Sequence, residues 1–458
     1  MACTIEKEAA VIQDDLAQRI SLGPRVVEPV EQWEMEEDLF VDLLGKLIGE
    51  SKWLQNNPPE LVPTEDRAAR HVLEWLSPYT EENGGPLRVT QVAFVEGRSN
   101  VMVEYPGTGE GVVSFVGCHM DVVTANPDTW SYDPFTLTRD GDRLQGRGVT
   151  DCLGHVALVA ELFRRLGAAR PALGPSVVGV FIANEENATL PGIGVDEMVK
   201  RGLLDRCRGG PLYWVDTADS QPCIGTGGIA AWQLTAHGKL FHSGLPHKAV
   251  NPIELAMDAV ADMQARFYLD YGPHPEEDRY GFATGSTFKP TQWSVLPGSI
   301  NQIPGQATVC GDIRVTPFYD IHEVMARVQG YVDDINANPD ILARGQRGPH
   351  SKYELPSEGL RGRVELKFFD NVGKGVACDL DSVGFKALVS AFEAVNGSCT
   401  PYSITGSLPC IRELQEAGFD VQTMGFGKLA AYHANNEYGL LSDFKKGFRV
   451  LATLLGRF

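Results

Sequence analysis

Short runs of β-branched and aromatic residues alternate along this chain with longer segments whose apolar residues recur at helical spacing. Residues 34–54, 64–76 and 153–168 have the helical pattern, and Thr64 is placed to cap the second of these helices. Runs bounded by glycine and proline predict strands at residues 89–95, 100–107, 111–118, 176–186 and 210–219. Strands that alternate with helices usually form parallel sheets covered on both faces. We therefore expect an α/β fold with a mostly parallel sheet.

The alternation of apolar strands and helices gives way near residue 228 to a different arrangement, and it resumes near residue 375. Between these points the sequence predicts a smaller α+β unit, with strands at residues 230–244 and 306–317, helices at residues 250–268 and 320–337, and a polar loop at residues 344–363. Residues 380–395 resume the first kind of helix. A chain of 458 residues is also too long for one core. We expect a larger domain built from residues 1–227 and 376–458, with residues 228–375 inserted into it.

Composition and charge narrow the classes of function. Hydrophobic residues are 43% of the chain and charged residues 22%, which is ordinary for a globular protein. The 40 basic and 60 acidic side chains give a net charge of −20, which disfavours nucleic acid as a partner and suits a cationic small molecule. The chain shows no apolar run of about 18 residues and no signal-peptide pattern, so we expect a cytoplasmic protein without a membrane span. Nine cysteines without a CxxC pair argue against a disulfide scaffold.

Side chains that can bind metals follow several of the predicted strands. The carboxyl ends of parallel strands meet at one edge of a sheet, and active sites gather there. We therefore expect these side chains to lie close together. They are His119, Asp121, Asp151, Glu185, Glu186, Asp216 and His433.

This set matches what a pair of divalent metal ions requires. Histidine nitrogen and carboxylate oxygen are the ligands that zinc and similar ions favour. Two ions about 3.5–4 Å apart need roughly five such groups, one of which binds both ions. The candidates are His119, Asp151, Glu186, Asp216 and His433, and Glu185 is left to accept a proton from water.

Each of these residues also has an ordinary structural explanation. A single histidine after a strand is more often a hydrogen-bonded polar residue, and the pair Glu185–Glu186 resembles a solvated loop. Asp151 could cap the helix that follows it, and Asp216 could cap a turn. The joint pattern favours the metal centre, because every candidate follows a strand-like segment.

Several motifs resemble the zinc-dependent aminoacylase and carboxypeptidase superfamily, which includes desuccinylases and deacetylases. They are GCHMDVV, WSYDPF, GRGVTDCLGH, ANEEN, VDTADSQP, GKLFHSG, GSINQIPGQATVCGDIRVTP and AYHANNEY, in this order across residues 60–458. The phrases GRGVTDCLGHVALV, PLYWVDTAD, YVDDINANPD and PYSITGSLP look closest to the eukaryotic acetylornithine deacetylase group. The resemblance implies a catalytic domain with an inserted lid and dimerisation domain, and a homodimer formed through that insert.

The resemblance also implies a role for each candidate residue. His119, Glu186, Asp216 and His433 would bind two divalent ions, Zn²⁺ or alternatively Co²⁺, and Asp151 would bridge them. Asp121 would orient His119, and Glu185 would be the general base. In the insert, His242 would reach a neighbouring subunit's site and polarise the scissile carbonyl. The substrate would be held by Asn301, Arg314 and Gly406.

Two residues depart from the pattern of the superfamily. His155 replaces the second of a glycine pair, and packing is favoured over metal binding as its role. Asp216 stands where glutamate is common, which makes it the least secure of the ligands.

The activity implied is hydrolysis of the amide of N2-acetyl-L-ornithine to L-ornithine and acetate, a step of arginine biosynthesis. Three alternatives stay open: another N-acyl-amino-acid hydrolase or dipeptidase of the superfamily, a cysteine hydrolase that uses Cys118 or Cys152, and a binding protein that has kept only the fold. The cysteine hydrolase is disfavoured, because neighbours on a strand such as Cys118 and His119 point to opposite faces.

Overall fold

The computed structural model describes residues 28–188, 190–342 and 353–458. Within these residues the main sheet has nine strands in the order β1-β2-β6-β3-β7-β19-β8-β17, and β18 pairs with β8. The bounds of its strands are β1 Arg88–Ala93, β2 Ser99–Tyr105, β3 Val112–His119, β6 Ser176–Ile182, β7 Pro211–Val215, β8 Gln221–Thr226, β17 Val376–Ala377, β18 Tyr402–Ile404 and β19 Asp420–Gly425.

The centre of the main sheet is parallel. Strands β6, β3, β7 and β19 run in the same direction, whereas β2 on one side and β8 on the other run antiparallel to them. Strand β3 is buried along its whole length, as its continuous apolar run requires when helices cover both faces. The expected α/β fold is confirmed, as a mixed sheet with a parallel core.

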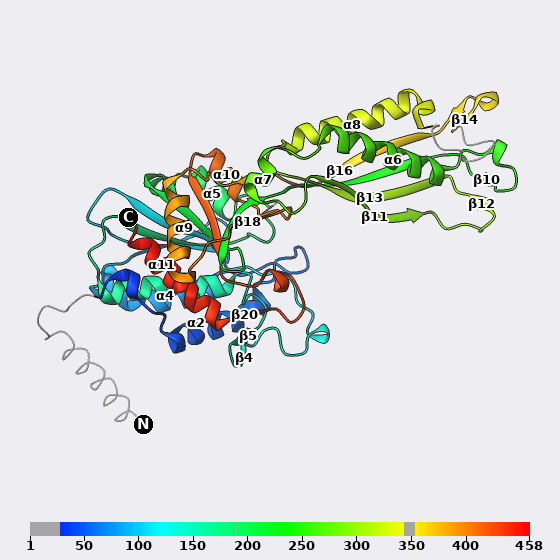
Figure 1. Ribbon diagram of the computed structural model, residues 1–458. Helices are drawn as coiled ribbons and strands as arrows, with labels where there is room; N and C mark the ends of the chain where they lie inside the picture. Colours follow the sequence, from blue (N-terminus) through cyan, green and yellow to red (C-terminus); the bar gives the residue numbers. More distant parts are fainter. Residues whose placement is uncertain (1–27, 189, 343–352) are drawn as a thin grey trace, which may run out of the picture.

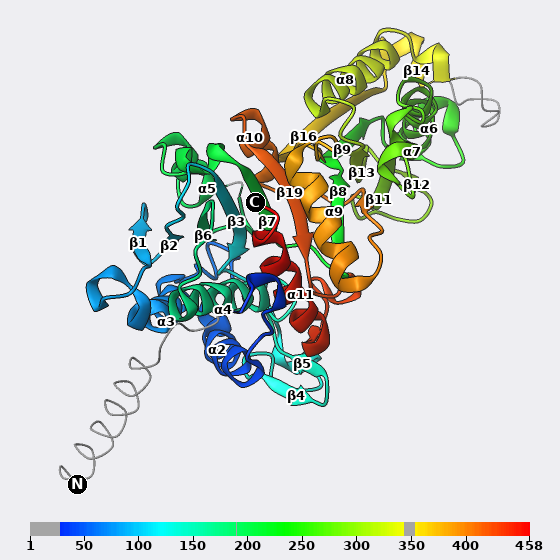
Figure 2. The same ribbon diagram turned by 60° about the vertical axis from the view of Figure 1, so that its left-hand side comes forward.

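Helices cover both faces of this sheet (Figures 1 and 2). One face carries α2 Glu37–Glu50, α3 Asp66–Leu76, α4 Leu153–Ala169, α9 Val383–Asn396 and α11 Leu441–Leu455, and the other carries α5 Val195–Lys200 and α10 Ile411–Glu416. The prediction that Thr64 caps α3 is wrong: the residue before the helix is Glu65, and no side chain caps that end. The Glu65 side chain is instead buried and bound to Arg98, at 2.5 and 2.7 Å.

A second, antiparallel sheet has the strand order β11-β13-β9-β16. Its strands are β9 Gly228–His237, β11 Thr287–Val295, β13 Gln306–Val315 and β16 Arg363–Gly373, and its helices are α6 Pro252–Asp270, α7 Glu276–Tyr280 and α8 Ile321–Ala337. Helices α6 and α8 pack on one face over a separate core in which Trp232 stacks on Phe288, with ring centroids 4.6 Å apart. The short strands β10 Phe241–His242 and β12 Gln302–Ile303 lie at the end farthest from the main sheet (Figure 1).

We call residues 228–375 the inserted unit, because the chain leaves the main sheet after β8 and returns to it at β17. The two crossings lie side by side: Thr226 pairs with Val376 in the main sheet, and Ile229 pairs with Gly373 in the second. A Cβ atom on Gly375 would lie only 2.8 Å from the carbonyl oxygen of Thr226, so glycine allows the two crossings to approach this closely.

The polar loop predicted at residues 344–363 is only partly testable, because residues 343–352 lie outside the described part of the chain. Its remainder forms the hairpin β14 Glu354–Leu355 and β15 Leu360–Arg361, after which β16 begins. The long strand β16 was not foreseen, because charged residues occupy its exposed positions.

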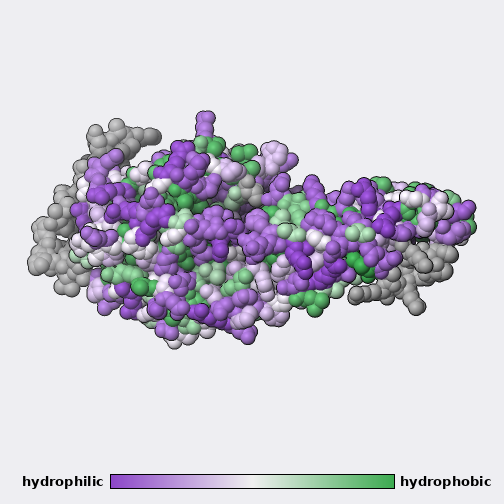
Figure 3. Space-filling view, turned by 90° about the horizontal axis from the view of Figure 1, so that it is seen from above, coloured by the Kyte–Doolittle hydropathy of each residue, from purple (hydrophilic) through white to green (hydrophobic). Residues whose placement is uncertain are grey.

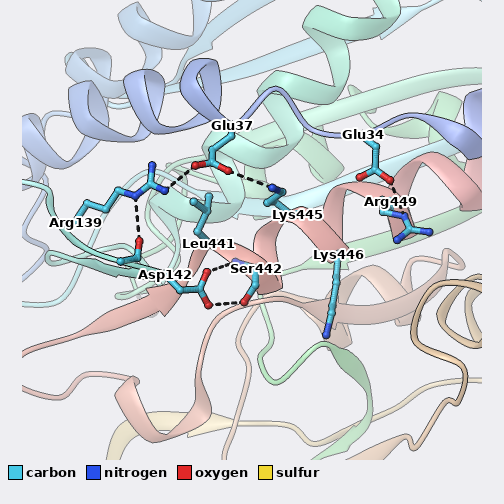
Figure 4. Close-up of a pocket in the computed structure, with 10 residues that line it drawn as sticks. Glu34, Glu37, Arg139, Asp142, Leu441, Ser442, Lys445, Lys446 and Arg449 are labelled. Carbon is cyan, nitrogen blue, oxygen red and sulfur yellow. Dashed lines mark hydrogen bonds and ion pairs between the residues drawn. The ribbon is translucent and has the colours of Figure 1, made fainter.

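A small sheet joins a hairpin to a strand almost 300 residues later in the chain. It contains β4 Thr138–Asp140, β5 Arg143–Gln145 and β20 Tyr438–Leu440. Figure 4 shows how its turn is tied to α11: the Asp142 carboxylate accepts hydrogen bonds from the main-chain nitrogen and the hydroxyl of Ser442, at 2.8 and 2.6 Å. Glu37 of α2 binds both Arg139 and Lys445 beside it. The pocket between these groups, of about 410 Å³, is lined by none of the predicted site residues.

The surface in Figure 3 is mostly hydrophilic, with hydrophobic residues in small groups. Among the residues described, none of the helices is both long enough and apolar enough to cross a membrane.

Candidate metal centre

His119 is the last residue of β3 and is completely buried. The strand is irregular just before it, where Gly117 has a φ of 90° and where a Cβ atom would lie 2.4 Å from the ring of Trp214. Only glycine fits this position, and the irregularity sets the direction in which His119 leaves the strand. Its Nδ1 lies 2.9 Å from the main-chain oxygen of Asp121, which leaves Nε2 facing the cluster of carboxylates.

Asp151 lies between the two predicted histidine ligands. Its Oδ1 is 2.9 Å from Nε2 of His119, and its Oδ2 is 3.1 Å from Nε2 of His433. The residue precedes α4 but does not end a strand of the main sheet, so the expectation that every ligand ends such a strand is too simple. Asp151 thus presents one carboxylate oxygen to each histidine, which is the arrangement in which one carboxylate could bind two ions.

The remaining predicted ligands complete one group around each histidine. Asp216 follows β7, and its Oδ1 lies 3.5 Å from Nε2 of His119. Glu186 follows β6, and its Oε2 lies 3.3 Å from Nε2 of His433. Among the described residues, the buried Oδ1 of Asp216 has no hydrogen-bond donor. A buried carboxylate oxygen left in this state is costly, and a cation would satisfy it.

The two groups differ in their access to solvent. The His119 side chain is 0% exposed, whereas that of His433 is 57% exposed. An ion beside His119 would therefore be enclosed, and an ion beside His433 would open to solvent and substrate.

The charges of the cluster favour cations. Burial alone would lower the pKa of His119, but the carboxylates of Asp216 and Glu185 outweigh it and hold that pKa well above its usual value. Hydrogen bonds to Asp151 and Glu186 raise the pKa of His433 to about 10. Without metal, these surroundings favour the protonated form of both imidazoles, and divalent ions would replace those protons.

Glu185 lies beside the two groups. Its Oε2 is 3.8 Å from Nε2 of His119, farther than the same nitrogen is from either Asp151 or Asp216. Burial, with the nearby charges of Asp216 and Glu186, raises the pKa of Glu185 well above its usual value. A carboxylate of this kind readily takes up a proton.

Asp121 positions the Glu185–Glu186 pair as well as His119. Its carboxylate accepts hydrogen bonds from the main-chain nitrogens of Glu185 and Glu186, at 3.1 and 3.0 Å, and from Nδ2 of Asn56 at 2.8 Å. It lies 3.5 Å from Nδ1 of His119, so the main-chain oxygen of Asp121 is the closer partner of that ring. The sequence analysis did not identify Asn56, which lies in a segment without periodicity.

A buried polar network behind Asp121 was also not foreseen. Nδ2 of Asn56 and Nη2 of Arg98 both donate to Oδ1 of Asn184, at 3.0 and 3.1 Å. Asn184 has a positive φ of 64° and directly precedes Glu185. Burial raises the pKa of Glu65, the partner of Arg98, to about 7, although Arg98 opposes this. Nothing in the sequence around Glu65 or Arg98 indicates that these two side chains pair in the interior.

His155 is structural, as the sequence favoured. Its Nε2 accepts a hydrogen bond from the main-chain nitrogen of Phe426 at 2.8 Å. Burial lowers its pKa to about 3, so the ring is neutral.

The two cysteines beside the cluster are poor nucleophiles. Burial raises the pKa of Cys118, and raises that of Cys152 well above its usual value, so both remain thiols. The sulfur of Cys152 nevertheless lies within 4.8 Å of ligand atoms of His119 and Asp216, which the sequence did not foresee.

Four predicted residues are not part of the cluster. His242 and Asn301 lie together at the far end of the inserted unit: His242 pairs with Gln302 between β10 and β12, and the nitrogen of Ser243 donates to the main-chain oxygen of Asn301 (Figure 1). Within one chain this end is remote from the main sheet. Arg314 and Gly406 lie at the near end, where Arg314 pairs with Ile229 and where the oxygen of Gly406 accepts a hydrogen bond from Gly227 at 2.8 Å.

Comparison with known proteins shows similarity along nearly the whole chain. The chain is 60% identical over 425 residues to an acetylornithine deacetylase of Arabidopsis thaliana, which covers 92% of this chain and 96% of that protein. The fold resembles human carnosine dipeptidase 1, with a TM-score of 0.65, 17% identity, and coverage of 95% of this chain and 99% of the other. It also resembles a dinuclear metal binding peptidase of Bacillus subtilis from the M20 family, with a TM-score of 0.57, 16% identity, and coverage of 92% and 98%.

The family model described as peptidase family M20/M25/M40 matches residues 115–457. That span contains every residue of the candidate metal centre. On this match and on the close relative, the chain belongs to peptidase family M20/M25/M40.

Proposed function

We propose that this chain hydrolyses N2-acetyl-L-ornithine to L-ornithine and acetate. The substrate is suggested by the 60% identity to the Arabidopsis thaliana acetylornithine deacetylase, which extends over 96% of that relative. The observation that carries the hydrolytic chemistry is the convergence of two histidines and two acidic groups around Asp151.

Two divalent ions, Zn²⁺ by the chemistry of the donors, would be held by these residues. His119 and Asp216 would bind the enclosed ion, Glu186 and His433 the outer ion, and Asp151 both. Bound ions supply Lewis acidity, which lowers the pKa of water and polarises a carbonyl.

Glu185 is the general base in this proposal. It takes a proton from the attacking water and passes it to the α-amine that leaves when the amide breaks. Asp121 holds Glu185 in place through the main-chain nitrogen, at 3.1 Å.

The inserted unit acts as lid and dimer platform. His242 is exposed at its far end, so we assign it to the site of a partner subunit, where it polarises the acetyl carbonyl. Strand β11 forms one edge of the second sheet and exposes Trp293 and Val295, with Leu296 and Ile300 just beyond it. A second copy of this chain would cover these apolar side chains.

Asn301, Arg314 and Gly406 contact the substrate in this assignment. The guanidinium of Arg314 suits the α-carboxylate by its paired N–H groups. The net charge of −20 suits the cationic side chain of ornithine.

A panel of N-acyl amino acids tests the proposal. The protein loaded with Zn²⁺ or Co²⁺ is assayed with N2-acetyl-L-ornithine, other N-acetyl amino acids, N-succinyl-diaminopimelate and dipeptides, and the chelated protein is the control. We expect the highest kcat/KM for N2-acetyl-L-ornithine and loss of activity on chelation. A preference for another member of the panel would assign the chain to an aminoacylase, desuccinylase or dipeptidase, and activity that survives complete chelation would contradict the metal centre.

A further inference from the structure

The segment Trp130–Pro134 and the residue Glu437 have no part in the chemistry above, yet the structure packs them together around Arg147. The Arg147 guanidinium lies 5.0 Å from the ring centroid of Trp130, and its Nη1 donates to Oε2 of Glu437 at 2.7 Å. The main-chain nitrogen of Arg147 donates to the oxygen of Pro134 at 2.8 Å. The side chains of Arg147 and Glu437 are 1% and 0% exposed. A buried ion pair so fully enclosed is costly unless all its hydrogen bonds are made.

Glu437 makes these hydrogen bonds with the loop that carries Asp151. Its Oε1 accepts from the main-chain nitrogens of Thr150 and Asp151, at 2.7 and 3.0 Å. Its Oε2 accepts from the main-chain nitrogen of Gly148, at 3.1 Å, in addition to Arg147. Since Glu437 is four residues after His433, a single carboxylate links the segments that carry two of the metal-binding residues.

Arg147 extends the same link. Its Nη2 donates to the main-chain oxygens of Thr124 and Ala434, at 3.2 and 3.4 Å. Ala434 is next to His433, and Thr124 follows the segment that carries His119 and Asp121. The pair therefore contacts three of the segments that meet at the metal centre.

We propose that Glu437, held by Arg147 and the Trp130–Pro134 segment, is a positioning residue that sets the distance between Asp151 and His433. The inference rests on the proposed metal centre. Residues behind metal ligands usually orient them, and their loss typically lowers metal affinity by ~10–100-fold.

The arrangement requires a carboxylate and not merely a polar side chain. Both oxygens of Glu437 face N–H donors, two on each side. A glutamine has one acceptor oxygen and one NH₂ donor, so in either orientation its NH₂ would face two N–H groups. Glu437→Gln therefore removes two hydrogen bonds at nearly constant volume.

Glu161 offers a matched control. It is also buried and also binds an arginine, Arg164, at 2.7 and 2.8 Å, but both lie in helix α4, and Arg164 also binds Glu36, the residue before α2. Glu161→Gln should cost stability in a similar way without moving Asp151 or His433.

The experiment measures Co²⁺ binding to the metal-free full-length protein, by calorimetry and by the visible absorption of bound Co²⁺. We expect Glu437→Gln to bind Co²⁺ ~10–100-fold more weakly, with a changed absorption spectrum, and Glu161→Gln to match the wild type in both. If Glu437→Gln bound Co²⁺ with the affinity and spectrum of Glu161→Gln, the proposal would be overturned.

If Glu437→Gln does not fold, the Co²⁺-binding measurement is made on Arg147→Lys instead. Lysine keeps the positive charge but cannot reach Glu437, Thr124 and Ala434 together, so we expect a smaller loss of affinity in the same direction. Wild-type affinity in this variant would overturn the proposal. A wild-type protein that bound no Co²⁺ would instead contradict the metal centre itself, so the two failures are distinguishable.

Discussion

Asp151 is the residue on which the candidate site depends most. Its two oxygens face His119 and His433, which lie more than 300 residues apart in the sequence and belong to segments with no direct pairing. The adjacent residues Glu185 and Glu186 make different contacts: Glu186 lies 3.3 Å from Nε2 of His433, whereas Glu185 lies 3.8 Å from Nε2 of His119. Single substitutions can therefore separate chemistry from metal binding.

Glu185→Gln should retain metal and lose turnover. Proton transfer by a positioned carboxylate typically contributes ~10²–10⁴-fold, and we expect kcat to fall by that factor while zinc content stays near that of the wild type. Glu186→Gln is the matched control and should lose the outer ion together with activity. The measurements are turnover and metal content on the same samples; near-normal turnover of Glu185→Gln would remove Glu185 from the role of base.

The clustering of His119, Glu186 and Asp216 could be predicted because each ends or follows an apolar strand, but the residues that support the cluster could not. Asn56 lies 65 residues from Asp121, to which it donates, and nothing local marks it as buried. Glu437 directly follows a pair of asparagines and looks like a loop residue, yet it is fully enclosed. Such hydrogen bonds join residues far apart in the sequence, and the spacing of apolar residues indicates only the local secondary structure.

At the scale of the helices and strands, the spacing of apolar residues predicted the buried elements but not the elements with an exposed, charged face. Strand β3 and helix α4 lie where they were expected, because their apolar residues form continuous or helical patterns. Strand β16 was missed, since Arg363, Glu365 and Lys367 occupy its exposed face beside a polar segment. Helix α3 was foreseen, but the predicted Thr64 cap is wrong: Glu65 precedes the helix, and its side chain pairs with Arg98 instead of capping.

Helix α8 has a side-chain cap that can be tested. The Asp320 carboxylate accepts hydrogen bonds from the main-chain nitrogens of His322 and Glu323, at 2.8 and 3.1 Å. Asp320→Ala should destabilise the start of α8 by ~1 kcal/mol at pH 7, whereas Asp320→Asn keeps an acceptor and should lose less. Hydrogen exchange of the α8 amides measures the difference, and equal exchange in all three proteins would contradict it.

The effect of this cap should depend on pH. Hydrogen bonds from Glu323 and His322 lower the pKa of Asp320 below its usual value of 3.8. The ionised form is thus favoured in the folded state, so its stabilisation is present above that value and is lost as the pH falls through the folded-state pKa. The difference between Asp320→Ala and the wild type should shrink in acid, and a constant difference down to that range would argue against an ionised cap.

At the scale of the whole molecule, the inserted unit carries His242 away from the metal centre of its own chain (Figure 1). His242 is exposed in a two-residue strand, where its Nδ1 accepts a hydrogen bond from the main-chain nitrogen of Gly244 at 3.0 Å. In the proposed dimer, each subunit would supply this histidine to the metal centre of the other.

Hybrid dimers test this arrangement. His242→Ala and Glu185→Gln chains are co-expressed with different tags, and the mixed dimers are purified. If His242 acts on the partner's site, one of the two sites holds both intact residues, and activity should return to about half that of the wild-type dimer. Purified homodimers of each variant are the controls, and mixed dimers as inactive as these would place His242 in its own chain's site or outside the reaction.

The neighbouring crossings at Thr226–Ile229 and Gly373–Val376 have an evolutionary consequence. Because entry and exit lie side by side, a short linker could close the gap without altering the path of the remaining strands. Recombination could therefore gain, exchange or discard the whole appendage in one event, while the residues around Asp151 kept their geometry. A shortened descendant would keep the main sheet and the cluster around Asp151, and it would lose the exposed edge formed by β11.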